Sequence, residues 1–120
     1  MIAIYVFFGG GLGSLSRFGI GQASLKFYNG KFPLGTLLAN FLACLLLGWG
    51  IYYMKSKGAL ENEWFKYLVL VGFCGGFSTF STFSGETLKL FQEQLYFIGI
   101  LNILISLLLG IFVIYIFTKA

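Results

Sequence analysis

Residues 72–83 read GFCGGFSTFSTF and lie in the middle of an apolar segment. Three glycines, at positions 72, 75 and 76, precede a run of serine, threonine and phenylalanine that ends at Phe83. Each glycine weakens a helix by about 1 kcal/mol relative to alanine. Any backbone amide or carbonyl that is freed at membrane depth must find a partner in protein, water or an ion. The stretch therefore predicts a helix that breaks at the paired glycines and carries a site at the break.

The composition of the whole chain is that of a membrane protein. The chain has 120 residues, of which 58% are hydrophobic and 10% charged, and its mean hydropathy is +0.90. A soluble domain of this size carries more charge. The first segment has neither a basic stretch before it nor a small-residue cleavage site, so we do not interpret it as a removable signal peptide. The net charge of +4 is spread among the loops, which gives no basis for nucleic-acid binding.

Four hydrophobic segments follow one another, each close to the ~20 residues needed to cross a hydrocarbon core of ~30 Å. Their approximate bounds are Ile2–Leu25, Leu34–Met54, Tyr67–Phe91 and Leu95–Phe117. Short polar connections join them, so the sequence predicts an all-α membrane protein with a single four-helix transmembrane domain over residues 1–120. Because a chain of this length encloses little of a pathway alone, we expect it to form oligomers.

Lysines are distributed almost evenly between the two sides of the predicted bundle. One side carries four and the other three: Lys55, Lys57, Lys66 and Lys119 against Lys26, Lys31 and Lys89. The positive-inside rule then gives almost no preference for either orientation. One interpretation is that the weak bias still fixes a single orientation. The interpretation we favour is dual topology, in which copies insert both ways and pair as an antiparallel homodimer with two-fold symmetry.

Polar residues recur at four-residue spacing in two of the segments. Asn40 lies in the second segment, and Asn102 and Ser106 lie in the fourth. Such residues either hold helices together through hydrogen bonds or line a pathway, where the side-chain amide of an asparagine offers two donors to an anion. The sequence alone leaves both roles open.

The first segment combines small residues with one charge. Gly9, Gly13 and Arg17 share a stripe on which small residues allow close packing of helices. A charge inside a segment is costly unless it is paired or reaches the interface. Arg17 therefore either extends to the interface and caps carbonyls, or raises the positive potential near an anion path.

Two aromatic rings follow the predicted break. Phe80, Phe83 and either Glu86 or Thr87 share one helix face. Phenylalanine normally packs in a core, but these rings alternate with hydroxyl groups. An aromatic ring has a positive edge, so ring edges and hydroxyl donors together suit a small anion that has shed its water.

Other kinds of chemistry lack the residues they need. No general base accompanies the serines and threonines, so we expect no enzyme. The chain has no histidine, and Cys44 and Cys74 lie in apolar segments, where we expect small hydrophobic side chains rather than a disulfide or metal site. Glu86 is the one acidic residue inside a segment, and it lies towards the end of that segment.

Three motifs carry a resemblance to a known family. Residues 9–18, 35–40 and 72–86 read GGGLGSLSRF, GTLLAN and GFCGGFSTFSTFSGE, of which the last is the most specific. On these motifs the chain resembles the Fluc/CrcB family of fluoride channels along its full length. The resemblance implies passive export of cytoplasmic fluoride through two pores at the interface of an antiparallel homodimer. It also implies the plasma (inner) membrane of a prokaryote, with fluoride, membrane lipid and a second copy of the chain as partners.

The resemblance further implies roles for individual residues. The fluoride pore would contain Asn40, Phe80, Phe83, Thr82, Ser81, Asn102 and Ser106, with Arg17 and Glu86 at its entrance. A structural Na+ at the dimer centre would be held by the main-chain carbonyls of Gly75 and Ser78 from both subunits. The family motif commonly has threonine where this chain has Ser78. Because the ligand would be a backbone oxygen, we expect this difference to matter little.

Two other functions stay open. A small multidrug or guanidinium exporter is also a four-span dual-topology dimer, but it would need a carboxylate in the first segment, where this chain has Gly9, Gly13 and Arg17. A non-transporting assembly partner is the third possibility, and it would move no ion.

Overall fold

The computed structural model describes residues 2–58 and 62–119, and within these ranges the regular structure is helical. The elements are α1 (Ile2–Phe27), α2 (Leu34–Ser56), η1 (Trp64–Phe73), α3 (Cys74–Phe77), α4 (Phe80–Gln92) and α5 (Tyr96–Lys119). Positions 1, 59–61 and 120 of the predicted domain lie outside the described residues.

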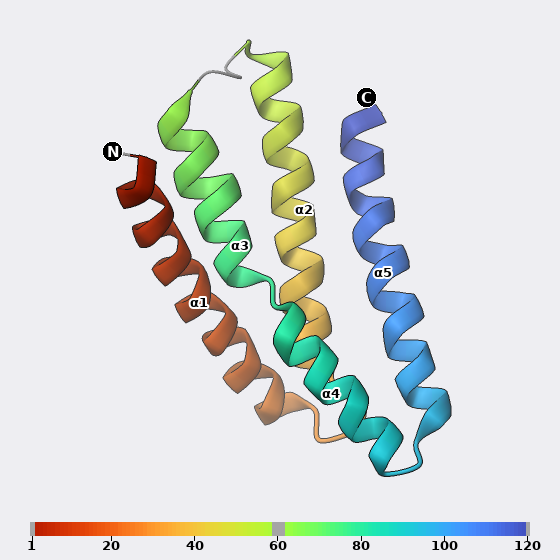
Figure 1. Cartoon of the computed structure of the whole chain (residues 1–120). Helices are drawn as coiled ribbons and strands as arrows, with labels where there is room; N and C mark the ends of the chain where they lie inside the picture. Colours follow the sequence, from red (N-terminus) through yellow and green to blue (C-terminus); the bar gives the residue numbers. More distant parts are fainter. Residues whose placement is uncertain (1, 59–61, 120) are drawn as a thin grey trace.

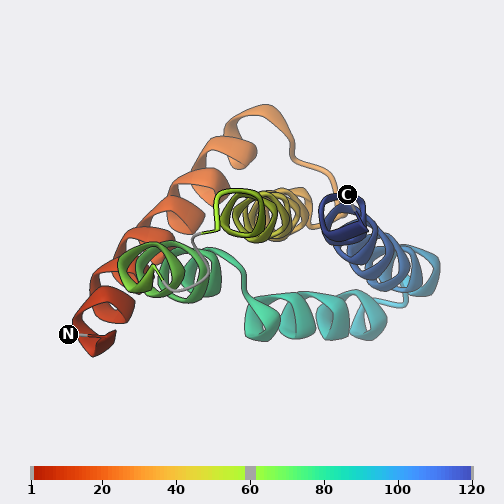
Figure 2. The same cartoon turned by 90° about the horizontal axis from the view of Figure 1, so that it is seen from above.

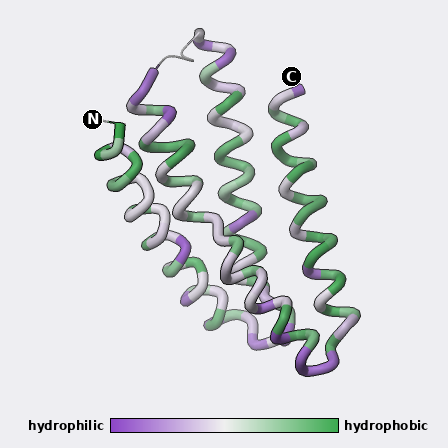
Figure 3. The backbone as a smooth tube through the Cα atoms, viewed as in Figure 1, coloured by the Kyte–Doolittle hydropathy of each residue, from purple (hydrophilic) through white to green (hydrophobic). Residues whose placement is uncertain are grey.

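Four helical stretches are long and apolar enough to cross a membrane: Ile2–Phe27, Leu34–Ser56, Trp64–Gln92 and Tyr96–Lys119. This confirms the predicted all-α class and the four spanning segments, with ends that differ by a few residues from those expected. Figure 1 shows the helices running alongside one another as an elongated bundle, and Figure 3 shows hydrophilic residues gathered near the helix ends. Large apolar side chains are exposed along α1 and α5, as expected for surfaces that face lipid or another subunit.

Local sequence signals explain where several helices begin and end. Pro33 precedes α2 with φ −77°, close to the value its ring imposes and suited to a helix start. Gly58 follows α2 with φ +65°, a left-handed conformation typical of the residue after a helix end. Gln94 has φ +64° in the tight turn between α4 and α5, where the N–H of Leu95 donates to the carbonyl of Leu90 at 2.8 Å.

The packing places α2 between two neighbours. Seen from above, α2 lies between α1 and α5, and α4 runs along a separate side of the molecule (Figure 2). α1 also packs on η1 and α3, whereas α4 packs on α5. A small core of Ala39, Ala43 and Phe77 lies where α2 meets α3.

Glycines allow α1 to approach η1 and α3 at backbone distance. A Cβ at Gly9 would overlap the carbonyl oxygen of Leu68, and a Cβ at Gly13 would overlap that of Phe73. The close packing predicted for this stripe of α1 is confirmed at both positions. η1 itself is a π-helix of ten residues, an unusual length for this rare conformation.

Two extended residues separate α3 from α4. Ser78 has φ −82° and ψ 157°, and Thr79 has φ −150° and ψ 116°. The sequence pattern placed the interruption at Gly75 and Gly76, but both glycines lie within α3. A Cβ at Gly76 would overlap the carbonyl oxygen of Gly10. This glycine therefore serves close packing against α1 rather than chain reversal or unwinding.

Ser78 is the residue at which α3 ends. Both the N–H and the hydroxyl of Ser78 donate to the carbonyl of Cys74, at 3.0 and 2.9 Å. The last turn of α3 is closed by this residue, and the chain leaves the helix directly afterwards.

Candidate functional site

The side chain of Asn40, in the N-terminal half of α2, pairs with both backbone groups of Thr79. The N–H of Thr79 donates to Asn40 Oδ1 at 2.7 Å, and Asn40 Nδ2 donates to the carbonyl of Thr79 at 3.4 Å. This is the pairing that a neighbouring β-strand would supply, and it satisfies an extended residue at membrane depth. Of the two donors expected from the Asn40 amide, one is therefore used within the chain and one is left for another partner. The helix-linking role is observed, and the role in an anion path stays a prediction.

Thr79 also begins α4. Its Oγ1 accepts a hydrogen bond from the N–H of Thr82 at 3.2 Å and lies 3.4 Å from Ser81 Oγ. A threonine that accepts from the third following amide is a favoured N-cap. The predicted hydroxyl residues Ser81 and Thr82 are thus gathered around one N-cap at the start of the helix.

The two phenylalanines of α4 lie close together on the helix surface. The ring centroids of Phe80 and Phe83 are 6.2 Å apart and their planes meet at 40°. The Phe80 side chain is 79% exposed, so most of this ring lies open at the surface of the chain. Phe83 is partly buried.

One turn after Phe83, a chain of hydrogen bonds connects α4 to α5. Asn102 is buried at 1% exposure, and its Nδ2 donates to Thr87 Oγ1 at 2.9 Å. Thr87 Oγ1 donates in turn to the carbonyl of Phe83 at 2.7 Å, and Ser106 Oγ donates to Asn102 Oδ1 at 3.3 Å. Asn102 therefore contacts the helix that carries the two rings, and Ser106 bonds to Asn102 within α5.

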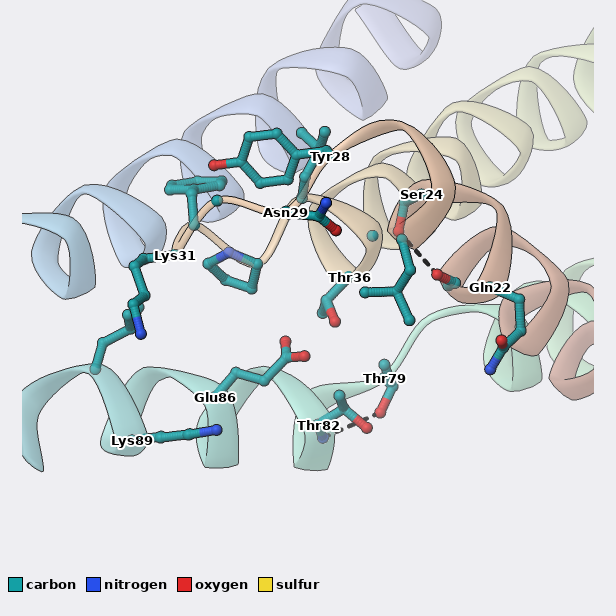
Figure 4. Close-up of a pocket in the computed structure, with 18 of the residues that line it drawn as sticks. Gln22, Ser24, Tyr28, Asn29, Lys31, Thr36, Thr79, Thr82, Glu86 and Lys89 are labelled. Atoms are coloured by element: carbon teal, nitrogen blue, oxygen red, sulfur yellow. Dashed lines mark hydrogen bonds between the residues drawn. The ribbon is translucent and has the colours of Figure 1, made fainter. Parts of the chain in front are cut away.

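A cavity of about 580 Å³ lies between α1, α4, the start of α2 and the connection from α1 to α2 (Figure 4). The predicted entrance residues Arg17 and Glu86 both line it, together with Thr79 and Thr82. The structure thus brings the entrance pair together with the N-cap of α4. In Figure 4 the Glu86 carboxylate points from α4 into the cavity.

The cavity contains more positive than negative groups. Arg17, Lys31 and Lys89 line it along with Glu86 and Glu93. Lys31 Nζ lies 3.8 Å from Glu93 Oε1. Glu86 Oε1 is buried and has no hydrogen-bond partner among the described residues, so it can accept from a water molecule or another donor that enters the cavity.

The carbonyls proposed to hold Na+ have a distinctive hydrogen-bond environment. In a continuous helix the amides of Thr79 and Thr82 would donate to the carbonyls of Gly75 and Ser78. Here both amides donate to side-chain oxygens instead, Thr79 N–H to Asn40 and Thr82 N–H to Thr79. Gly75 is exposed, and a Cβ built on it would meet no heavy atom within 4 Å. These oxygens therefore fit the donor type that a dehydrated monovalent cation takes from a backbone.

A family model described as CrcB-like protein, Camphor Resistance (CrcB), matches residues 4–117. The chain belongs to the CrcB family. This confirms the family indicated by the three sequence motifs.

Similar proteins of known name support the family membership. The chain is 42% identical over 108 residues to a Dehalococcoides mccartyi protein named fluoride-specific ion channel FluC, a match that covers 90% of this chain and 82% of that protein. It is 39% identical over 109 residues to a protein of the same name from Salmonella arizonae, covering 89% of this chain and 83% of that protein. With its four long apolar helices, the CrcB chain is a multi-pass membrane protein of an ion-channel family, which is not a class of enzymes.

Two residues that organise this CrcB site were not among the predicted site residues. Thr79 pairs with Asn40 and Thr87 pairs with Asn102. The signal for Thr87 was its helical spacing from Phe80 and Phe83. The extended backbone at Thr79 was not predicted, because the low helix propensity of Gly75 and Gly76 favours an interruption at those glycines instead.

Proposed function

We propose that this CrcB-family chain is a fluoride-selective ion channel through which fluoride leaves the cytoplasm passively, lowering its toxicity. The observation that carries the proposal is the position of the 580 Å³ cavity. It leads from Arg17 to Thr79 and Thr82, the residues that flank Phe80 and Ser81 in the sequence. The relatives of the same family that are named fluoride-specific ion channels support the choice of ion.

Positive charge at the cavity draws the anion in. Arg17, Lys31 and Lys89 outnumber Glu86 and Glu93 around it, and a recess with net positive charge raises the local concentration of an anion. The Glu86 carboxylate reduces this potential locally, and its buried Oε1 accepts from the water that fluoride brings.

Beyond the cavity, protein groups replace the water around fluoride. The second N–H of Asn40 and the hydroxyls of Ser81 and Thr82 supply donors, and the edges of Phe80 and Phe83 supply positive ring hydrogens. Asn102 and Ser106 continue the polar path along α5. Several weak sites allow the ion to leave as readily as it enters, whereas the larger chloride does not fit the narrow path between the rings.

The proposal includes a dimer. Each subunit is one four-span domain over residues 1–120, and two copies insert in opposite orientations in the inner membrane of a prokaryote, surrounded by lipid. The break in the third span brings Phe80 and Gly75 to the subunit surface, where both are exposed. An aromatic ring and a bare backbone at a subunit surface favour contact with a second copy, which would complete two pores along the interface.

The same interface would hold a structural Na+. The carbonyls of Gly75 and Ser78 would approach their symmetry mates near the two-fold axis, where their negative ends repel one another. The diversion of the Thr79 and Thr82 amides to side chains leaves these oxygens available. A monovalent cation would supply the charge that offsets this repulsion.

The test is fluoride release from liposomes. Purified protein is reconstituted into liposomes loaded with potassium fluoride, valinomycin is added, and external fluoride is recorded with an electrode; a chloride-loaded sample is the control. Fast fluoride release without chloride release supports the proposal. If a folded dimer in the presence of sodium releases no fluoride, the proposal is refuted and the exporter or assembly-partner function is favoured.

The same assay tests the rings. Phe80→Ile and Phe83→Ile keep an apolar side chain but remove the ring edge, and we expect each to cut fluoride release sharply while the dimer stays folded. Phe97→Ile, on α5, is the matched control because Phe97 is 75% exposed and lies outside the proposed pathway. Wild-type release from a folded Phe80→Ile dimer would contradict the role given to that ring.

A further inference from the structure

Thr87 occupies an unusual position on α4. It is one of two buried residues of this helix, the other being Leu90. Its exposure is 6%, so it does not line the cavity or the subunit surface. A hydroxyl in such a place is expensive unless both its donor and its acceptor are used, which is the case here.

Only one assignment of donors and acceptors satisfies all the hydrogen bonds that connect Ser106, Asn102, Thr87 and Phe83. The single hydroxyl proton goes to the carbonyl of Phe83, 2.7 Å away. The lone pair must then accept from Asn102 Nδ2 at 2.9 Å, which turns Asn102 Oδ1 towards the hydroxyl of Ser106 at 3.3 Å. The hydrogen bonds therefore run in one direction, from Ser106 on α5 to the backbone of Phe83 on α4.

This series of hydrogen bonds is the middle one of three contacts that hold α4 in place. At the N-terminal end, Asn40 pairs with Thr79. At the C-terminal end, the Phe91 ring lies so close to Gly99 that a Cβ there would be 2.6 Å from it. Thr87 lies between these points, and its partner Asn102 comes from α5, the helix on which α4 packs.

We propose that Thr87 is a positioning residue for the ion pathway. By fixing Asn102 against the turn of α4 that contains Phe83, it sets the height and rotation of α4 on α5 and thus the direction in which the Phe83 ring points. The residue itself touches no ion. This inference rests on the fluoride-channel function proposed above.

The experiment measures single channels in planar lipid bilayers with fluoride on both sides, using the full chain. Thr87→Val keeps the shape of the side chain and removes both hydrogen bonds, whereas Thr87→Ser keeps the hydroxyl. The matched control is Thr118→Val. Thr118 makes the same type of bond to its own helix, Oγ1 to the Ile114 carbonyl at 3.0 Å, but it is exposed at the end of α5.

The unitary current, which is the current through a single open channel, distinguishes a positioning role of Thr87 from an effect on folding alone. We expect Thr87→Val to lower the unitary fluoride current sharply, because the Phe83 ring is no longer held in place, and to reduce the fluoride-to-chloride permeability ratio. Thr87→Ser should restore both quantities, and Thr118→Val should match the wild type. A purely structural role would reduce only the yield of folded dimer and leave the unitary current unchanged.

Each result decides between the two proposals. Wild-type unitary current and selectivity in Thr87→Val would overturn the positioning role while leaving the channel function intact. A silent wild-type protein would instead overturn the channel function and, with it, this inference. If Thr87→Val yields no folded dimer, Thr87→Ala removes the same two hydrogen bonds, and an unchanged unitary current in that variant would overturn the positioning role.

Discussion

Gly13→Ala adds one heavy atom where the backbone of α1 packs closely on that of the third span. The added Cβ would overlap the carbonyl oxygen of Phe73 and would lie 2.8 Å from the amide nitrogen of Phe77 and 3.1 Å from the carbonyl carbon of Phe73. Ordinary van der Waals contact begins at 3.4 Å. Because all three neighbours are backbone atoms, no side chain can rotate away, and α1 must separate from α3 by more than half an ångström.

The magnitude follows from comparison with a glycine that has free space. Gly19, also on α1, is exposed, and a Cβ built there meets no heavy atom within 4 Å. Both substitutions gain about 1 kcal/mol of helix propensity. The difference between the two variants therefore isolates the cost of overpacking, about 1–3 kcal/mol, with Gly19→Ala more stable than the wild type and Gly13→Ala less stable.

Thermal unfolding in detergent is followed with a dye that becomes fluorescent when it reacts with a thiol. Cys74 is 5% exposed in the folded protein, so in a Cys44→Ala background, which leaves one thiol, the dye reports unfolding when Cys74 becomes accessible on heating. We expect the unfolding midpoints to rank in the order Gly19→Ala, wild type, Gly13→Ala. Fluoride release should fall in Gly13→Ala as well, because Phe73 and Phe77 lead directly to the extended residues. A midpoint for Gly13→Ala equal to or above that of Gly19→Ala would refute the requirement for backbone contact.

Two further substitutions test polar contacts of very different worth. Asn40→Leu removes the side-chain groups that pair with the N–H and the carbonyl of Thr79. We expect the free energy of unfolding to fall by about 1–3 kcal/mol for each backbone group left unsatisfied, which lowers the midpoint in the same dye assay and reduces fluoride release. An unchanged midpoint would show that water replaces the amide. Lys31→Ala breaks the ion pair with Glu93, in which the two side chains are 70% and 39% exposed. We expect the free energy of unfolding to fall by less than about 1 kcal/mol. A large drop in midpoint would mean that Lys31 has a second structural role.

The spanning segments were predictable because they depend on length and apolar content alone. Both are local properties, and the four long helices agree with the expected segments to within a few residues. The interruption of the third span was misplaced for a physical reason. Low helix propensity marks a glycine equally well as a break or as a close contact, and only the contact of Gly76 with the Gly10 backbone shows which one applies here.

The polar residues of the site were also visible in the sequence, but their partners were not. Asn40 and Asn102 stand out because amides are rare within apolar segments. Their partners lie 39 and 15 residues away along the chain, and one of them is a backbone. A pattern along one helix says which face is polar, but it does not say which groups meet that face after the helices pack.

The pairing of Asn40 with Thr79 also bears on the order in which the protein assembles. Within residues 64–92 the helix ends at Phe77 and resumes at Phe80, while the Thr79 amide is satisfied by a side chain from the preceding span. Alone in a bilayer, this segment would have no such partner and would lower its free energy by remaining a continuous helix. The extended geometry is therefore acquired when the second and third spans dock, so membrane insertion precedes formation of the site, and a nascent chain acquires the site only as its bundle closes.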